Sequence, residues 1–408
     1  MSERVVIVGG GVAGVSTAGA LRAGGFDGDL TLVDAGEFPY DRPPLSKDFL
    51  AGTQDIKQIA LKPQQWYDDQ RVRLMNRTTV SALRPADGAV ELVDGALLPA
   101  DRVVLATGGG AARPPIPGAH SDRVHVLRTA KDADRLREAL GSGARVLVVG
   151  AGLIGAEAAS TAVRLGCEVV LADPVAVPLA AAIGAELADW LHGLHHRAGI
   201  TTLHTGVDGF TDRPGGIEAR FTDAGEPAAE PQVFDAVLLG VGMVPRTEIA
   251  QSAGLRVEGG IVVDERQLTS HPAVLAVGDP ARTRRDGVLL PRTEHWEAAQ
   301  HDGARAAATL LGTTPPPATA PWFWTDRHDR HVEAVGHMAS AELTVVRGSY
   351  DDPAFAVFGL RDGHVVAAAS VDDPMAVRAA RRMIDRQVAV RAGPLADPSV
   401  NLRSLLRG

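Results

Sequence analysis

Apolar residues follow the same order in two separate segments of the chain. The first segment is RVVIVGGGVAGVSTAGALRAGGFDGDLTLVDA at residues 4–35, and the second is RVLVVGAGLIGAEAASTAVRLGCEVVLAD at residues 145–173. Each segment reads as a buried β-branched strand, a glycine turn, an alanine-rich helix, a glycine stop and a second apolar strand that closes on an acid. The pattern predicts two strand–turn–helix–strand units.

The turn of each unit carries the spacing Gly-x-Gly-x-x-Gly. Its glycines are Gly9, Gly11 and Gly14 in the first unit and Gly150, Gly152 and Gly155 in the second. In this motif the first glycine permits a tight turn, the second lets backbone approach a pyrophosphate, and the third lets helix pack on strand. The pyrophosphate then lies at the positive N-terminus of the helix. Asp34 and Asp173 close the second strands, where a carboxylate binds ribose hydroxyls. Two dinucleotide sites are therefore expected.

Two further apolar runs end in small residues. They are RVVLATGGG at residues 102–110 and AVLAVGDPAR at residues 273–282. Ligands of open α/β sheets gather at the carboxyl ends of strands, so Asp279 is placed where it can accept hydrogen bonds from a polyol. The alternative is an ordinary turn aspartate.

The character of the chain changes at residues 310–324, LLGTTPPPATAPWFW, whose four prolines cannot continue a helix. This stretch is expected to be a linker. Beyond it, LTVVRGSY, FAVFGL and HVVAAAS alternate with turn residues and predict a small antiparallel sheet, followed by the helix MAVRAARRMIDRQV. The expected fold class is α/β, with two Rossmann-like dinucleotide-binding domains and a small α+β C-terminal domain.

Size and charge narrow the function classes. The chain has 408 residues, 45% of them hydrophobic, which is enough for two or three globular domains. Its net charge of −9 lacks the broad basic footprint of a nucleic-acid-binding protein. No run approaches the ~20 apolar residues that span a bilayer, and MSERVVIVGG has no signal-peptide layout. A cytoplasmic protein that binds neither membrane nor nucleic acid is expected.

The cysteine content of the chain excludes chemistry that needs two thiols. Cys167 is the single cysteine, so neither an internal disulfide nor a Cys-x-x-Cys pair is possible, and its setting before an apolar strand favours a buried core residue over a nucleophile. A chain with two dinucleotide-binding units most simply exchanges hydride between a nicotinamide and a flavin, because that chemistry uses both dinucleotides. FAD is expected in the first unit and NADH in the second. Asp173 would repel the 2′-phosphate of NADPH, and PVAVPLAAAIG after it offers no arginine.

The segment PYDRPPLSKDFL at residues 39–50 resembles a segment of the FAD-dependent ferredoxin reductases that serve oxygenases. The resemblance covers essentially the whole chain, through LATGGGAARPPIPG, VHVLRTAKDADRL, LLGVGMVPRTEIAQSAGL, AVGDPAR, TEHWEAAQHDGARAA and PWFWTDRHDRHVEAVG in family order. It implies a glutathione-reductase-like fold. The implied domains are an FAD-binding domain at residues 1–110 and 236–315, an NAD-binding domain at 111–235 and an interface domain at 321–408.

The resemblance also assigns site residues. It places Lys47 beside the flavin ring, Glu157 in a pair with Lys47, and Trp296 at the reactive edge of the flavin, and these three are the expected catalytic residues. Without the resemblance, Glu157 would read as an ordinary acid in the first turn of a helix. The implied FAD-binding residues are Gly9, Gly11, Ala13, Gly14, Asp34, Arg42, Lys47, Ala106, Thr107, Gly108, Arg128, Asp279, Glu294, Trp296 and Trp322, with Trp324 in the same wall. The implied NAD-binding residues are Gly150, Gly152, Leu153, Ile154, Gly155, Glu157, Asp173, Val241 and Gly242. No metal site is expected.

The implied electron acceptor is a [2Fe-2S] ferredoxin, which in turn supplies a cytochrome P450 or a ring-hydroxylating dioxygenase. Relatives that reduce disulfides or peroxides need a thiol in the segment occupied here by residues 42–47, and this chain has none. An acidic ferredoxin could dock near a set of arginines, although a solvated loop is the equal alternative. The set is Arg282, Arg284, Arg285, Arg327 and Arg330.

Two other functions stay open at this point. A rubredoxin reductase differs only in its partner, and a protein like apoptosis-inducing factor would use the same fold for redox-controlled binding. Arg246 stands where the family commonly has asparagine, which leaves strict preference for NADH over NADPH undecided.

Overall fold

A computed structural model describes residues 3–222 and 230–407. The chain divides into two compact units. Unit 1 comprises the described parts of Met1–Arg42, Asp55–Gly110 and Met243–Ala318, and unit 2 those of Pro43–Gln54, Ala111–Gly242 and Thr319–Gly408. The segment that carries Lys47 thus belongs to unit 2.

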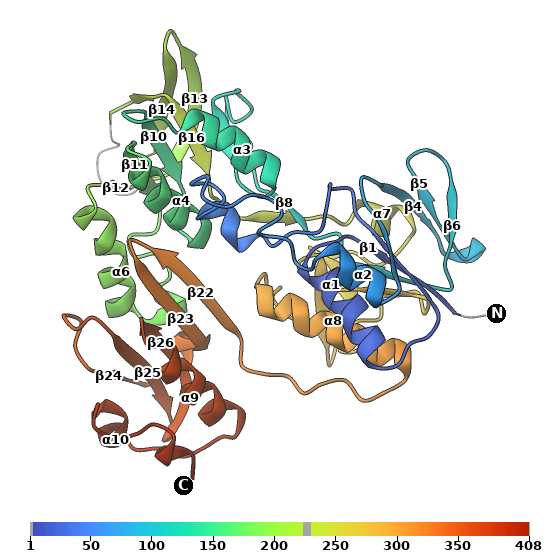
Figure 1. Cartoon of the computed structure of the whole chain (residues 1–408). Helices are drawn as coiled ribbons and strands as arrows, with labels where there is room; N and C mark the ends of the chain where they lie inside the picture. Colours follow the sequence, from blue (N-terminus) through green and yellow to red (C-terminus); the bar gives the residue numbers. More distant parts are fainter. Residues whose placement is uncertain (1–2, 223–229, 408) are drawn as a thin grey trace. The chain divides into compact units, whose positions relative to one another are not determined.

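The centre of unit 1 is a parallel sheet with strand order β19-β7-β1-β2-β3 (Figure 1). Its strands are β1 (Arg4–Val8), β2 (Asp29–Val33), β3 (Val72–Met75), β7 (Arg102–Leu105) and β19 (Val274–Ala276). Helix α1 (Val12–Ala23) joins β1 to β2, as the first apolar segment predicts. Both faces of the sheet are covered, which explains why its strands are apolar at nearly every position.

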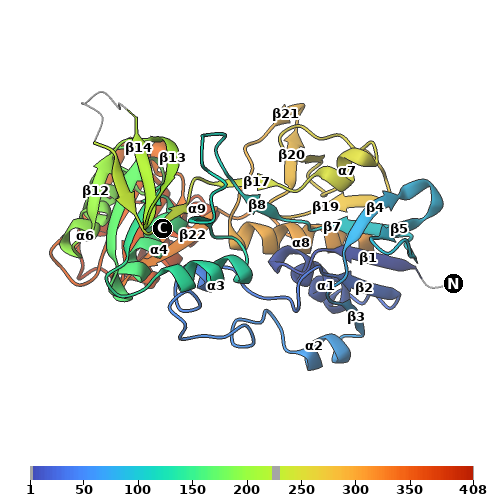
Figure 2. The same ribbon diagram turned by 90° about the horizontal axis from the view of Figure 1, so that it is seen from above.

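Two long helices cover one face of this sheet, and smaller strands together with one short helix cover the other. Helices α1 and α8 (Trp296–Leu311) lie side by side in both views (Figures 1 and 2). The remaining elements are α2 (Gln64–Asp69), α7 (Glu248–Ser252), η2 (Pro85–Asp87), the sheet β4 (Val80–Arg84), β5 (Ala89–Leu92), β6 (Leu97–Pro99), the sheet β18 (Ile261–Val263), β20 (Ala281–Arg285), β21 (Val288–Leu289), and the ribbon β8 (Gly109–Ala111), β17 (Met243–Pro245).

Unit 2 contains the second parallel sheet, with strand order β12-β11-β10-β16-β9. Its strands are β9 (Val124–Val126), β10 (Arg145–Val149), β11 (Glu168–Asp173), β12 (Thr201–His204) and β16 (Ala236–Leu239). Helix α4 (Leu153–Arg164) joins β10 to β11, so the second predicted unit is also confirmed. The other elements here are η1 (Pro43–Ser46), α3 (Ala130–Ala139), α5 (Ala180–Ile183), α6 (Ala185–Arg197) and the antiparallel sheet β13 (Val207–Arg213), β14 (Gly216–Phe221), β15 (Gln232–Phe234).

The C-terminal part of unit 2 is an antiparallel sheet with strand order β22-β23-β26-β25-β24. Its elements are β22 (Trp322–Arg327), β23 (Arg330–Gly336), β24 (Leu343–Arg347), β25 (Phe355–Arg361), β26 (His364–Val371), α9 (Pro374–Asp385), α10 (Ala392–Ala396), η3 (Met338–Ser340) and η4 (Ser404–Arg407). Helix α9 packs on one face (Figure 1), and the apolar side of α6 packs on the other. The C-terminal sheet therefore shares a hydrophobic core with helix α6.

The expected linker is shorter than its sequence pattern indicates. Helix α8 continues through Leu311 before Gly312 caps it, and strand β22 already begins at Trp322. The prolines thus lie between these elements, where no backbone hydrogen-bond ladder needs their missing N–H groups. The described residues contain no helix that is long and apolar enough to cross a membrane.

Strands β22 and β23 form a tight hairpin. Its turn residues His328 and Asp329 have φ values of 52° and 58°, as the central pair of a hairpin turn that matches strand twist requires. The register pairs Asp326 with His331 and Trp324 with Glu333. Because side chains alternate along a strand, these four side chains share one face of the hairpin.

A glycine in α8 marks the closest approach of α8 to α1. A Cβ atom at Gly303 would lie 2.8 Å from the carbonyl oxygen of Ala13 and 2.9 Å from the backbone nitrogen of Thr17. We expect Gly303→Ala to lower the free energy of unfolding by about 1–3 kcal/mol because the helices must separate. Gly193→Ala, in helix α6, is the matched control. Its new methyl group would meet only the flexible end of Arg197, at 3.8 Å, so a gain of about 0.5–1 kcal/mol is expected. Urea unfolding of both variants measures the difference, and equal effects would contradict the packing argument.

Candidate functional site

The first glycine turn is closed by backbone contacts and open on one side. Gly9 has φ of 113°, and a Cβ there would lie 2.2 Å from the carbonyl oxygen of Ala106. A Cβ at Gly14 would lie 2.0 Å from the oxygen of Gly9. At Gly11, in contrast, the nearest atom would be Nη1 of Arg42, at 3.8 Å. The turn thus leaves room beside a guanidinium at the N-terminus of α1, where a pyrophosphate fits.

Other residues of the expected FAD set lie in the same unit. The carboxylate of Asp34 lies against Gly10, where a Cβ would be 2.8 Å from its Cγ. The Thr107 hydroxyl donates to the carbonyl oxygen of Arg246 at 2.7 Å. Trp296 begins helix α8, and its Nε1 donates to Oδ1 of Asp41 at 2.8 Å, which fixes the indole.

The turn that follows β19 is held by hydrogen bonds to side chains that the sequence pattern does not indicate. Arg292 donates to the carbonyl oxygen of Asp279 at 3.2 Å and pairs with Glu294 at 2.9 Å. The backbone N–H of Gly278 donates to Oδ2 of Asp302 on α8, also at 3.2 Å. Asp302 therefore braces the turn from the helix side.

The second glycine turn repeats the first within unit 2. Gly150 has φ of 99°, and a Cβ there would lie 2.5 Å from the oxygen of Gly240. A Cβ at Gly155 would lie 1.9 Å from the oxygen of Gly150, whereas a Cβ at Gly152 would meet no described atom within 4 Å. Oδ2 of Asp173 accepts the N–H of Ala151 at 2.7 Å. The acid at the end of β11 thus lies next to an open turn.

Three exposed apolar side chains of unit 2 follow the second glycine turn or the ends of strands in the same sheet. Ile154 is 42% exposed, Val241 39% and Val175 57%. Ile154 follows the open turn directly, and Val175 follows Asp173, from whose Oδ1 its N–H receives a 2.7 Å hydrogen bond. Val175 and Val241 follow the carboxyl ends of the parallel strands β11 and β16, where ligands of such sheets bind. Ile154 and Val241 belong to the expected NAD-binding set, whereas Val175 does not, although its place shortly after Asp173 could have indicated it.

Lys47 and Glu157 are brought together within unit 2, as the resemblance implies. Lys47 follows the 3₁₀-helix η1, whose two prolines restrict its backbone. Its Nζ lies 3.4 Å from Oε1 of Glu157, and the Ser46 hydroxyl donates to Oε2 of Glu157 at 2.6 Å. Glu157 is only 4% exposed, so it is not the solvated helix acid of the alternative interpretation.

The buried Glu157 carboxylate also receives donors from the C-terminal hairpin. Its Oε1 accepts the Thr325 hydroxyl at 2.8 Å and the N–H of Asp326 at 3.1 Å. Lys47 in turn forms an ion pair with Oδ2 of Asp326. Sequence reasoning missed Ser46, Thr325 and Asp326, because their chemistry depends on which segments fold against α4.

An aromatic pair lies beside Lys47. The rings of Trp322 and Trp324 stack with centroids 5.1 Å apart, and Nζ of Lys47 is 5.5 Å from the Trp324 ring. Nε1 of Trp322 donates to Oε2 of Glu333 at 3.0 Å. The remaining residue of the expected FAD set in this unit, Arg128, lies just before α3 and donates its backbone N–H to Asp132.

The expected docking arginines differ in their availability. Arg327 is 3% exposed, so its proposed docking role is wrong: it points to the face of β22 opposite Asp326, and its Nη1 lies 3.3 Å from Nε2 of His195. Burial lowers the pKa of Arg327 to about 10. The other members of the set carry partners of their own. Arg284 pairs with Glu258, Arg285 with Glu265 and Arg330 with Asp372, while Arg282 donates to the carbonyl oxygens of Glu258 and Leu290.

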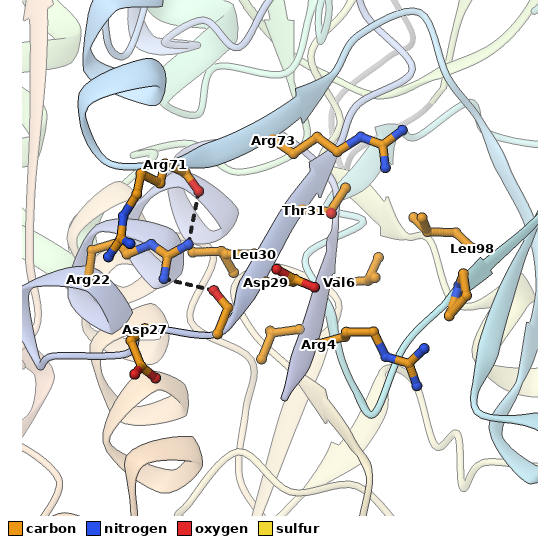
Figure 3. Close-up of a pocket in the computed structure, with 13 residues that line it drawn as sticks. Arg4, Val6, Arg22, Asp27, Asp29, Leu30, Thr31, Arg71, Arg73 and Leu98 are labelled. Atoms are coloured by element: carbon orange, nitrogen blue, oxygen red, sulfur yellow. Dashed lines mark hydrogen bonds between the residues drawn. The ribbon is translucent and has the colours of Figure 1, made fainter. Parts of the chain in front are cut away.

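Unit 1 also has a hollow of about 430 Å³ at the opposite ends of its strands (Figure 3). Arg4, Asp29 and Arg73 surround it in the close-up, and Arg22 donates to the backbone oxygens of Gly28 and Arg71. The hollow lies where β1 and β2 begin, whereas ligands of parallel sheets bind where strands end. It is therefore not the dinucleotide site.

The chain is similar in sequence and structure to several known proteins. Residues 3–303 match the model of the pyridine nucleotide-disulphide oxidoreductase family, and residues 322–406 match that of the reductase C-terminal domain. The chain is 38% identical to the anthranilate 1,2-dioxygenase system ferredoxin–NAD(+) reductase component of Burkholderia cepacia, over 99% of this chain and 100% of that protein. It is 36% identical to putidaredoxin reductase of Pseudomonas putida, over 99% and 97%. The structure superposes on the reductase of a covalent putidaredoxin reductase–putidaredoxin complex with a TM-score of 0.90, 33% identity and coverage of 99% and 98%.

The buried carboxyl group of Asp302 should make the stability of the protein depend on pH. Burial raises its pKa to about 6, against the lowering effect of the hydrogen bond from Gly278. A carboxyl whose folded pKa exceeds its unfolded value of about 4 stabilises the fold below pH 4 and loses that contribution as pH rises to 6. We expect the free energy of unfolding to fall by up to about 3 kcal/mol across this window and Asp302→Asn to abolish the fall. The exposed Asp286→Asn serves as control in urea titrations at several pH values. A fall that persists in Asp302→Asn would contradict the assignment.

Proposed function

Because the chain belongs to the pyridine nucleotide-disulphide oxidoreductase family, we propose that it is a FAD-dependent NADH:ferredoxin reductase that supplies a cytochrome P450 or ring-hydroxylating dioxygenase. The observation that carries this proposal is the Lys47–Glu157 pair beside an aromatic wall in a chain with a single cysteine. Relatives of this fold that reduce disulfides use a cysteine pair, which is impossible here. The buried Cys167, whose thiol pKa burial raises, offers no substitute.

The two glycine turns fit two dinucleotides. Each turn has its first and third glycines enclosed by backbone and its second glycine open, so a side chain at the second glycine would fill the space that a pyrophosphate needs. We propose that Gly11, Asp34 and Arg42 hold FAD and that Gly152, Asp173 and Val241 hold NADH. When bound, FAD accepts two electrons from NADH and releases them singly to an acceptor. The remaining members of the two expected sets, and the three-domain division, stay predictions.

Lys47 is proposed to act on the flavin as a fixed cation. Its charge is held by Asp326 and Glu157, and an ammonium in a partly buried site interacts with developing negative charge more strongly than in water. Glu157 positions Lys47, and Trp296 is proposed to border the reactive edge.

The proposed docking residues exclude the buried Arg327. Without Arg327, the candidates are Arg282, Arg284 and Arg285 on the hairpin β20–β21 of unit 1 and, as a separate candidate, Arg330 in unit 2. Since Glu258 and Glu265 partly neutralise the hairpin, an acidic ferredoxin must compete with them for the arginines. Such contacts affect association rate and salt dependence first.

Steady-state turnover with a [2Fe-2S] ferredoxin tests the function. We expect NADH to support reduction of the ferredoxin, NADPH to support it poorly because Asp173 repels the 2′-phosphate, and the rate to fall as salt screens docking. Arg284→Gln should raise the KM for ferredoxin, whereas Arg213→Gln, which breaks a comparable exposed pair with Glu218, should not. Flavin reduction without transfer to any ferredoxin would overturn the proposal.

Removal of the Lys47 charge tests its role. We expect Lys47→Met to slow reduction of the bound flavin by NADH about 100-fold, since one preorganised charge beside the reacting group is lost. The exposed Lys57→Met is the control. Stopped-flow flavin bleaching without oxygen measures the rate, and an unchanged rate in a folded Lys47→Met protein would exclude the assigned role.

A further inference from the structure

We propose that His331 is a positioning residue that, in its protonated form, holds Asp326 and thereby the ammonium of Lys47. The inference rests on the proposed function only for the effect of Lys47 on flavin reduction. The arrangement itself is a property of unit 2.

His331 lies between two carboxylates. Its Nδ1 is 2.5 Å from Oδ1 of Asp326, directly opposite on β22, and its Nε2 is 3.1 Å from Oε1 of Glu333, two residues along β23. These contacts arise from the hairpin register, which puts the three side chains on one face. The second oxygens of the two carboxylates are engaged by Lys47 and by Trp322. A continuous chain of polar contacts thus runs from Lys47 to the stacked tryptophans.

The geometry requires an imidazolium. A neutral imidazole has one N–H donor and one lone pair, so it can donate to one carboxylate while facing the other with an acceptor. Only the protonated ring donates to both. The electrostatics agree: burial opposes the charge on His331, but the hydrogen bonds to Asp326 and Glu333 outweigh it and raise the pKa of His331.

Deprotonation of His331 would change the partner choice of Lys47. With the imidazolium present, Oδ1 of Asp326 is fixed, and Oδ2 is aimed at Lys47. Burial opposes the charge on Asp326, but the hydrogen bonds from Lys47 and His331 prevail and lower its pKa. After the ring loses its proton, one of the two carboxylates loses its donor. Lys47 then has Glu157, at 3.4 Å, as its competing partner.

The surroundings allow the proton to exchange with solvent. His331, Lys47 and Asp326 line a hollow of about 310 Å³. The other charged or titratable groups around it come from the segment after η1, from α4 and from the hairpin and the end of β26, and are Asp48, Arg164, Arg327, His328, Asp329, Arg330 and Asp372. Asp372 accepts the backbone N–H of His331 at 2.9 Å and pairs with Arg330, so it adds no free charge to the ring.

The expected pH dependence has a definite sign. The pKa of His331 in the folded protein is raised above its usual value of about 6.5. Protonated His331 therefore stabilises the fold fully below that pH, and this stabilisation is lost as pH rises through the folded pKa. The hold on Lys47 should weaken in the same window. The rate of flavin reduction by NADH should therefore fall several-fold as pH rises through it.

The first test is independent of activity. Histidine ring signals of the holoprotein, labelled at Cε1, are titrated by NMR, and His331→Gln identifies the His331 signal among the 13 histidines. We expect a His331 pKa above the usual value that falls by about one unit or more in Asp326→Asn and in Glu333→Gln. An ordinary pKa, unmoved in both variants, overturns the proposal.

The second test is the pH profile of anaerobic flavin reduction. We expect His331→Gln to lose the pH step and to keep a low, flat rate, because glutamine cannot donate to both carboxylates as a cation. Glu333→Gln should move the step to lower pH, and His337→Gln, an exposed histidine after β23, should leave it unchanged. A step that persists in His331→Gln, or its absence from the unmodified protein, overturns the positioning role. Failure of NADH to reduce the flavin at any pH would instead overturn the proposed function.

Discussion

The buried carboxylate of Glu157 is the constraint around which unit 2 is organised. An ionised carboxylate that is withdrawn from water must be surrounded by donors, because an unpaired buried charge is strongly destabilising. Its donors come from two segments that are distant from α4 and from each other in sequence: Ser46 and Lys47 near the N-terminus, and the hairpin strand that carries Thr325. The requirement to satisfy one side chain thus joins the end of η1 and the C-terminal sheet to helix α4. The contacts that stabilise this fold are the same contacts that orient Lys47.

The sequence predicts those features that depend on residues close together in the chain. The strands, turns and helices of the two glycine units follow from residues that are close together in the chain, and they form as expected. The Lys47–Glu157 pair was accessible only through family resemblance, because 110 positions separate its members. Asp326 and His331 could not be assigned, since their meeting depends on hairpin register. The docking role of Arg327 was expected from its charge alone, without regard to the alternation of side chains along a strand. Its neighbour Asp326 lies on the polar face of β22, so Arg327 lies on the buried face.

Surface charge is distributed more evenly than a count of arginines indicates. Arg284, Arg285 and Arg330 each have a carboxylate within ion-pair distance, and these pairs join residues that are well separated in sequence. A basic run in the sequence is therefore not the same as a basic surface. Exposed ion pairs are individually weak, so a partner with a better-placed carboxylate can displace them at little cost.

The shared core of α6 and the C-terminal sheet affects how the chain folds during its synthesis. The apolar side of α6, with Leu187 and Leu191, is covered by residues of β23 and β25, yet α6 ends at Arg197 and the sheet begins only at Trp322. At bacterial or eukaryotic translation speeds of about 5–20 residues per second, the helix waits roughly 6–25 s for its covering strands. During that interval its leucines form an exposed hydrophobic surface on the nascent chain. A ribosome-associated chaperone would find its binding segment there, and a prematurely terminated chain would be an aggregation hazard instead of a smaller working protein.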